Sequence, residues 1–212
     1  MSTKTAELLA LVGGQPVIPV LKIEDAAAAV PLARTLARGG LRAVEVTLRT
    51  PAALEAIRRV AAEVEEAVVG AGTLLDAGQL EAAQAAGPRF IVSPGLTREV
   101  LAAAAGSAVP LLPGAITPGE IMAAREAGLD FLKFFPAEQA GGAAFLKALA
   151  SPFSGIRFCP TGGVGPENAA DYLGLPNVAC VGGSWVAPDG LVKASRWDEI
   201  GKLAREAAGL RR

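Results

Sequence analysis

Short apolar runs recur along the chain at regular intervals and alternate with longer alanine-rich segments. The runs are rich in Val, Ile, Leu and Phe, which is typical of strands buried on both faces. Their starts lie about 20 to 26 residues apart, close to the minimum for a strand, a helix and two loops. We predict eight strands, over Val17–Leu21, Ala43–Leu48, Val68–Ala71, Phe90–Ser93, Pro110–Pro113, Phe131–Phe134, Ile156–Cys159 and Val178–Val181.

Helix boundaries are marked by capping residues and by glycine. Thr50-Pro51 fits an N-cap followed by proline, and Thr117-Pro118-Gly119-Glu120 fits a capping box. We further expect a leading helix over 3–13, a helix over 76–86 that packs through Leu80, Ala83 and Ala86, and a final helix over 197–208. Glycines stand where helices should end in a left-handed residue, at Gly39-Gly40, Gly87, Gly106, Gly128 and Gly155.

Eight strand–helix units without a long linker predict a single (β/α)8 TIM barrel domain over residues 1–212, with a short N-terminal helix. The main competitor is an open doubly wound sheet, which usually carries Gly-x-Gly-x-x-Gly after an early strand. Gly70-Ala71-Gly72 comes nearest to this motif, but it follows the third strand and position 75 is leucine. We therefore favour the barrel.

Composition narrows the possible functions. The 212 residues are 51% hydrophobic and 19% charged, as in a globular domain. The net charge of −1, the lack of a basic block and the lack of a long apolar stretch argue against nucleic-acid and membrane partners, so we expect a cytoplasmic protein. The chain has no histidine, which excludes histidine triads and histidine-ligated zinc. Cys159 and Cys180 lie in apolar runs and should be reduced in that compartment.

Polar side chains stand at the carboxyl ends of the predicted strands, where barrel enzymes carry their active sites. Glu45 and Arg49 share one face of the second strand, so Glu45 should point into the barrel and Arg49 should lie at its rim. An internal Glu45–Arg49 salt bridge is the structural alternative. Thr73 follows the third strand, where small residues leave room for a ligand and the hydroxyl could bind a carboxylate. Pro94 belongs to a sharp turn after the fourth strand.

Glycine-rich loops follow the seventh and eighth strands, which is the usual phosphate site of such barrels. Gly162-Gly163 and Gly183-Ser184 let backbone amides approach an anion closely. A single loop of this kind could be a bare turn, but two at these strand ends favour a phosphorylated substrate. Lys22, after the first strand, is a further candidate for an anion contact.

The sixth strand carries a lysine in an otherwise apolar run, Phe131-Leu132-Lys133-Phe134-Phe135-Pro136. Burial favours the neutral amine of lysine, which is the nucleophile of Schiff-base chemistry. The ordinary alternative is a lysine whose stem packs while its ammonium reaches water. Alternation places Phe134 on the packing face and Phe135 on the face of Lys133. With Glu45 across the barrel mouth and candidate anion sites nearby, Lys133 suits carbon–carbon cleavage of a phosphorylated 2-keto acid.

The segments that hold these residues resemble the 2-keto-3-deoxy-6-phosphogluconate (KDPG) aldolases, including those that act on 4-hydroxy-2-oxoglutarate. The resemblance implies a class I aldolase without metal or cofactor, which yields pyruvate and glyceraldehyde 3-phosphate and assembles as a homotrimer. The matching segments run in order across nearly the whole chain, over 44–50, 69–73, 93–95, 132–138, 157–163 and 182–185.

The resemblance also implies a role for each candidate. It makes Lys133 the Schiff-base lysine and Glu45 a proton carrier that acts through a bound water, and Arg49 with Thr73 would hold the substrate carboxylate. Pocket residues would be Pro94, Phe135 and Thr161, and phosphate would bind at Gly162, Gly163, Gly183 and Ser184. From the residues alone, a phosphate-binding barrel isomerase or epimerase, a non-catalytic sugar-phosphate binder and a related phosphosugar aldolase stay open.

Overall fold

Strands and helices alternate along the whole chain in a computed structural model that describes residues 3–12 and 14–210. Eight strands occur within these residues, and all of their pairings are parallel. Parallel neighbours require a crossover, which the intervening helices supply. The strands are β1 (Val17–Leu21), β2 (Ala43–Thr47), β3 (Val68–Gly72), β4 (Phe90–Val92), β5 (Leu111–Leu112), β6 (Phe131–Phe134), β7 (Arg157–Pro160) and β8 (Val181–Gly183).

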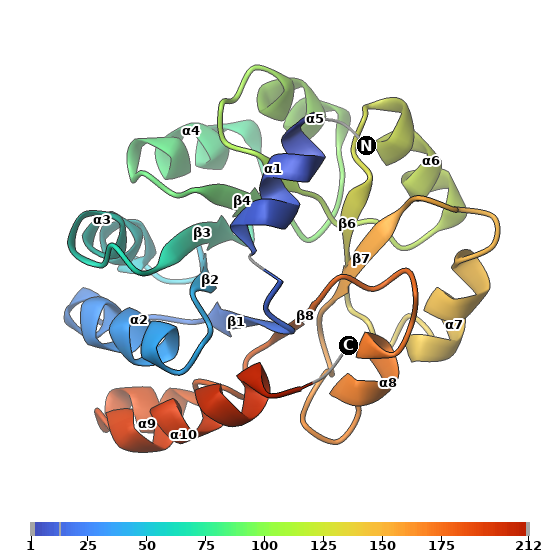
Figure 1. Cartoon of the computed structure of the whole chain (residues 1–212). Coiled ribbons are helices and arrows are strands. Elements are labelled where there is room, and N and C mark those ends of the chain that lie inside the picture. The colour runs from blue at the N-terminus through green and yellow to red at the C-terminus, as the bar shows by residue number, and fades with distance from the viewer. Residues whose placement is uncertain (1–2, 13, 211–212) are drawn as a thin grey trace.

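The helices lie outside the strands, except for the first one, which lies across their centre in Figure 1. None of the helices in the described part of the chain is both long enough and apolar enough to cross a membrane. They are α1 (Thr3–Leu11), the 3-10 turn η1 (Ala26–Ala28), α2 (Ala29–Arg38), α3 (Ala53–Glu63), α4 (Ala77–Ala85), α5 (Arg98–Ala105), α6 (Pro118–Glu126), α7 (Gly142–Leu149), α8 (Ala169–Leu173), α9 (Asp189–Lys193) and α10 (Trp197–Ala208).

The strands form two hydrogen-bonded groups. Six of them pair in the order β5-β4-β3-β2-β1-β8, and β6 pairs with β7. Isolated parallel bridges join the groups on both sides, at Gly114↔Lys133 between the end of β5 and β6, and at Phe158↔Val178 and Thr161↔Gly182 between β7 and β8. The structure therefore has an α/β fold built on a six-stranded parallel sheet, with the β6–β7 pair bridged to both of its edges.

Apolar side chains pack on both sides of the strands. Val44 and Val46 of β2 and Phe134 of β6 belong to the cluster between strands and helices, where Phe134 stacks on Phe145 with ring centroids 5.9 Å apart. A second cluster gathers other side chains of the strands, and Leu8 of α1 belongs to it. Its other buried members are Val12, Ile18, Ala43, Phe90, Val92, Leu112, Phe131, Cys159, Ala179 and Cys180. The alternation predicted for β2 and β6 is thus confirmed.

The leading helix is anchored by a lysine. Lys4 Nζ donates hydrogen bonds to the carbonyl oxygens of Ala104, Ala105 and Ser107 at 3.0, 3.0 and 2.9 Å. Carbonyls at a helix C-terminus lack partners within the helix, and a cation there also complements the helix dipole. The helix ends at Leu11, and residue 13 of the predicted range lies outside the described residues.

Several strands differ from the prediction by one residue at an end, and two elements differ by more. The last strand is Val181–Gly183 rather than Val178–Val181, because its ladder with β1 pairs Val17 with Val181 and Pro19 with Gly183. The apolar residues 178–180 are buried but precede the strand, and two of the three residues of the strand itself are glycines. The third helix begins at Ala53 without a side-chain cap, since the Thr50 hydroxyl donates to the Ile23 carbonyl at 2.5 Å instead.

Most of the predicted helix ends are confirmed. Thr117 and Glu120 form the expected capping box at the start of α6. Gly40, Gly87, Gly128 and Gly155 have positive φ angles of 97°, 81°, 77° and 93°. Gly106 is the exception, because it caps α5 with a right-handed φ of −82°. Helices 76–86 and 197–208 also appear, as Ala77–Ala85 and Trp197–Ala208.

Candidate active site

The centre of the site is a buried pair of opposite charges. Lys133 on β6 and Glu45 on β2 are 5% and 3% exposed, and Lys133 Nζ lies 3.2 Å from Glu45 Oε1. The lysine head therefore does not reach water, so the snorkelling alternative is wrong. The Glu45–Arg49 salt bridge is also wrong, because Glu45 pairs with Lys133. A buried amine within hydrogen-bond distance of a carboxylate has a partner to which it can pass a proton.

Gly72 makes room for this pair. A Cβ atom on Gly72 would lie 2.1 Å from Glu45 Oε1 and 2.4 Å from its Cγ, far inside van der Waals contact. Gly70 likewise faces the ring of Phe90, 2.3 Å from where its Cβ would be. The small residues of β3 thus accommodate side chains of the protein itself, whereas we had expected them to leave room for a ligand. Cross-strand neighbours of this kind follow from the pairing of β3 with β2 and with β4 rather than from β3 alone.

Arg49 and Thr73 follow the ends of β2 and β3. Arg49 Nε donates to Thr47 Oγ1 at 2.9 Å, which directs the guanidinium along the rim. Thr73 has a φ of +62°, a left-handed conformation that is uncommon for a β-branched residue and often occurs at functional sites. Among the hydrogen bonds of residues 3–12 and 14–210, none involves the Thr73 hydroxyl or joins it to Arg49.

Phe135 borders the amine, as its place on the Lys133 face predicted. Its ring centroid lies 5.3 Å from Lys133 Nζ, within the range of a cation–π contact. Pro94 lies in the neighbouring turn after β4, and its carbonyl oxygen is 2.1 Å from the position of a Cβ on Gly114. The turns after β4 and β5 are therefore in close contact beside β6, but among the described residues no hydrogen bond joins Pro94 to Lys133.

The glycine-rich loops after β7 and β8 are adjacent. Thr161 and Gly182 form a bridge, and a Cβ on Gly182 would lie 2.3 Å from Thr161 Oγ1. Gly162 and Gly163 have φ angles of +95° and +73°. In the described part of the chain, the backbone N–H groups of Gly162, Gly163 and Ser184 donate no hydrogen bond. Free N–H groups on two neighbouring loops are the arrangement that binds an anion. We call residues 161–165 the β7 loop.

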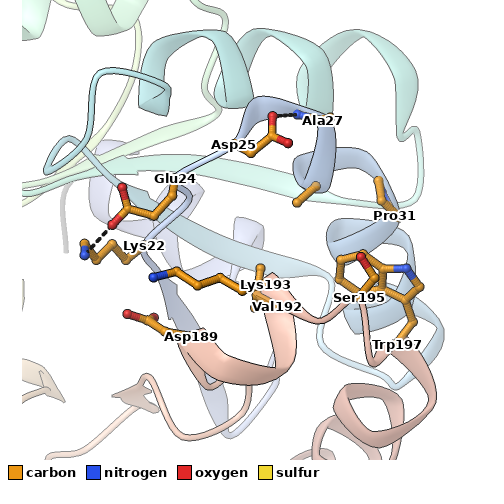
Figure 2. A pocket seen from close by; sticks show the side chains of 11 residues that line it. Lys22, Glu24, Asp25, Ala27, Pro31, Asp189, Val192, Lys193, Ser195 and Trp197 are labelled. Carbon is orange, nitrogen blue, oxygen red and sulfur yellow. Dashed lines mark hydrogen bonds and ion pairs between the residues drawn. The ribbon is translucent and has the colours of Figure 1, made fainter.

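Lys22 stands apart from these residues. Its ammonium lies 2.5 Å from Glu24 Oε1, and Figure 2 shows this pair beside Asp189 and Lys193 in a pocket of about 310 Å³. The hydrogen bond with Glu24 raises the pKa of Lys22, and the same contact lowers the pKa of Glu24. The structure therefore brings Lys22 to a rim pocket between β1 and α9, not into contact with Lys133 or Glu45.

The described residues hold no cluster of three or more His, Cys, Asp or Glu side chains placed to bind a metal ion. Cys159 and Cys180 are free and buried, so neither forms a disulfide. Both belong to the second apolar cluster, which also contains Leu8 of α1.

Known proteins share both the sequence and the fold. The family model described as KDPG and KHG aldolase matches residues 10–203. The KHG/KDPG aldolase of Escherichia coli K12 is 51% identical over 91% of this chain and 90% of its own. A KDPG aldolase structure from Legionella pneumophila, with pyruvate captured as a covalent carbinolamine, is 44% identical at a TM-score of 0.92, over 94% of this chain and 97% of that one.

A second solved structure agrees. The KDPG aldolase of Zymomonas mobilis ZM4 with 3-phosphoglycerate is 48% identical at a TM-score of 0.92, and the match covers 98% of both chains. The buried lysine–glutamate pair, the glycine loops beside it and matches of this extent lead to one assignment. The chain belongs to the KDPG and KHG aldolase family.

Proposed function

We propose that this chain is a class I aldolase that cleaves KDPG to pyruvate and glyceraldehyde 3-phosphate, and 4-hydroxy-2-oxoglutarate to pyruvate and glyoxylate. The observation that carries the proposal is the buried Lys133 amine, 3.2 Å from the Glu45 carboxylate. The carbinolamine held by the Legionella relative supports a covalent route through a lysine.

The reaction begins with proton transfer between the two buried groups. Glu45 accepts a proton from Lys133, and the neutral amine then attacks the C2 carbonyl of the substrate. The carbinolamine that results loses water with Glu45 as the acid, which leaves a protonated imine. Because Glu45 ends this step ionised, it is ready to act as a base.

Cleavage uses the imine as an electron sink. Glu45, through a water molecule, removes the proton of the C4 hydroxyl, the C3–C4 bond breaks, and its electron pair forms an enamine. The aldehyde product leaves. Glu45 then returns the proton to C3, and hydrolysis of the imine releases pyruvate and regenerates the Lys133 amine. One carboxylate serves throughout because each step leaves it in the opposite protonation state.

The remaining residues orient the substrate. The Arg49 guanidinium and the unengaged Thr73 hydroxyl bind the carboxylate next to C2. Phe135 forms the apolar wall beside the amine, with Pro94 and Thr161 closing the pocket. The free N–H groups of Gly162, Gly163 and Ser184, with Gly183, hold the phosphate at the far end of the substrate. Lys22 is the remaining candidate for an anion contact at the rim, although its ammonium is paired with Glu24.

We also infer the larger architecture. The bridges between β5 and β6 and between β7 and β8 support closure of the eight strands into a (β/α)8 barrel that forms one domain over 1–212. A homotrimer and a cytoplasmic location, both implied by the family resemblance, stay predictions. Sedimentation of the purified protein at about three times the chain mass of 21.4 kDa is the test of the trimer.

Borohydride trapping tests the covalent step. Incubation with pyruvate and sodium borohydride should attach one pyruvate-derived group to Lys133, located by peptide mass spectrometry. Lys133→Met should abolish the adduct, and Lys22→Met, the matched change of a rim lysine, should leave it intact. An adduct at Lys22, or none in the wild type, would refute the proposal and favour an isomerase, an epimerase or a binding protein.

The role of Glu45 has its own test. Glu45→Gln keeps the size of the side chain and removes its ability to accept a proton, so turnover should fall by about 10² or more. Unfolding temperature should be measured alongside. Unchanged turnover would remove Glu45 from the mechanism without affecting the assignment of Lys133.

A further inference from the structure

The turn after β6 is bonded to the β7 loop. The N–H of Ala137 donates to the Thr161 carbonyl at 2.8 Å, and the N–H of Glu138 donates to the Gly162 carbonyl at 3.1 Å. The strand that carries Lys133 is thereby joined, within a few residues, to the loop whose N–H groups are free. A fixed distance between these two parts matters because they hold opposite ends of one substrate.

Glu138 reinforces this connection with its side chain. A Cβ on Gly163 would lie 2.6 Å from Glu138 Cγ, so the stem of the glutamate rests directly on that glycine. The Glu138 carboxylate accepts a hydrogen bond from the hydroxyl of Tyr172 on α8. Glu138 is exposed, and without the tyrosine hydroxyl its side chain is free to turn into solvent.

Tyr172 is a rigid partner for this contact. It is 1% exposed and sits in the main apolar cluster. Burial, and then the neighbouring Glu138 carboxylate, raise the pKa of Tyr172, so its hydroxyl stays protonated and remains a donor. Gly142 lies beside the pair, since a Cβ there would be in ordinary van der Waals contact, at 3.5 Å, with both Glu138 Oε1 and the Tyr172 hydroxyl oxygen.

Asn168 holds the opposite side of the β7 loop. Its Oδ1 accepts from the Gly165 N–H at 2.8 Å, and its Nδ2 donates to the Gly163 carbonyl at 2.9 Å. The carbonyls of Gly162 and Gly163 are therefore both engaged by the protein. Their N–H groups, which donate to nothing within residues 14–210, stay available for an anion.

We propose that Glu138 and Tyr172 are a positioning pair that fixes the β7 loop relative to Lys133 and thereby sets the preference for phosphorylated over unphosphorylated 2-keto acids. This inference rests on the proposed function. Neither side chain touches the reacting carbons. If the pair is broken, the loop loses its support, so phosphate binding weakens while Schiff-base formation at Lys133 continues.

The test is Tyr172→Phe, which removes only the hydroxyl. KM for KDPG should rise about 10-fold, as expected when a hydrogen bond to a charged group is lost. Both kcat for KDPG and kcat/KM for the unphosphorylated 4-hydroxy-2-oxoglutarate should change less than about twofold. Glu138→Ala should repeat this pattern. Glu138→Gln, which still accepts the hydrogen bond, should stay near the wild type.

Several outcomes overturn the proposal. Equal losses on both substrates would mean that the pair supports the fold as a whole, and no change in KM would mean that the loop needs no such support. Should the wild type form no pyruvate adduct, the proposed function fails, and calorimetric titration with glyceraldehyde 3-phosphate then tests the pair alone. Weaker binding in Tyr172→Phe supports it, and equal binding refutes it.

Discussion

The contact between Gly72 and Glu45 allows a test of the proton carrier that leaves its chemistry intact. Gly72 does not have a positive φ, so Gly72→Ala meets no backbone strain and adds one methyl group. That methyl would lie 2.1 Å from Glu45 Oε1, whereas ordinary contact begins near 3.4 Å. The carboxylate must therefore retreat by more than 1 Å, in a site where its distance to Lys133 Nζ is 3.2 Å.

A displacement of this size should lower kcat strongly and lower the free energy of unfolding moderately. A misplacement of about 1 Å in a catalytic group can lower the rate about 10²-fold. Inserting a methyl into a packed site costs about 1–3 kcal/mol, which a protein with a typical stability of 5–15 kcal/mol withstands. We expect kcat for KDPG to fall about 100-fold with the protein still folded, measured as pyruvate release in a coupled lactate dehydrogenase assay.

The matched control is Gly95→Ala, since a Cβ on Gly95 meets nothing within 4 Å. It lies in the turn after β4 and should leave kcat unchanged. A second control is the double change with Glu45→Ala, which removes the carboxylate that the methyl would strike. In that background Gly72→Ala should cause no further loss, because coupled sites are not additive. Equal kcat in Gly72→Ala and Gly95→Ala would refute the reasoning.

Three further predictions concern single contacts. Thr73→Gly should leave the unfolding temperature unchanged or higher, because it relieves a left-handed φ of +62°, yet raise KM for KDPG several-fold in steady-state assays. Lys4→Met should lower the unfolding free energy by about 1–3 kcal/mol in urea titrations and leave kcat unaltered, since it strips three carbonyls near the end of α5 of their donor. Although burial raises the pKa of Glu120, hydrogen bonds from the Thr117 and Ile116 N–H groups and the Thr117 hydroxyl outweigh it and lower that pKa below its ordinary 4.5. Its stabilisation is present above pH 4.5 and lost as the pH falls through the lower folded value, so the destabilisation caused by Glu120→Gln should be largest near neutral pH and fade on acidification.

Alternation along single strands was enough to predict much of the site. It placed Glu45 opposite the packing face of β2, and Lys133 with Phe135 opposite Phe134, because successive side chains of a strand point to opposite faces. Capping chemistry likewise placed the start of α6 at Thr117. These features depend on residues a few positions apart, and the sequence displays such neighbours directly.

Features that depend on distant partners were not predictable in this way. The oxygen atoms that accept hydrogen bonds from Lys4 and Tyr172 belong to residues at least 100 and 34 positions away along the chain. From the sequence we interpreted the small residues around Gly72 as space for a ligand. Only the pairing of β3 with β2 shows that the side chain of Glu45 fills that space. The predicted range of the last strand was wrong because glycine adds nothing to a hydrophobic pattern. The backbones of Gly182 and Gly183 nevertheless pair with β1.

The division of the strands into two hydrogen-bonded groups has a mechanical consequence. Lys133 and the β7 loop belong to the β6–β7 pair, and Glu45 belongs to the six-stranded sheet. Isolated bridges are the only ladder contacts that cross the two seams between these groups in the described chain. A slight sliding at either seam would therefore change the separation of amine and carboxylate without breaking a bond inside either group. Substitutions at Gly114 and Gly182, which form two of these bridges, are therefore expected to change the distance between Lys133 Nζ and Glu45 Oε1.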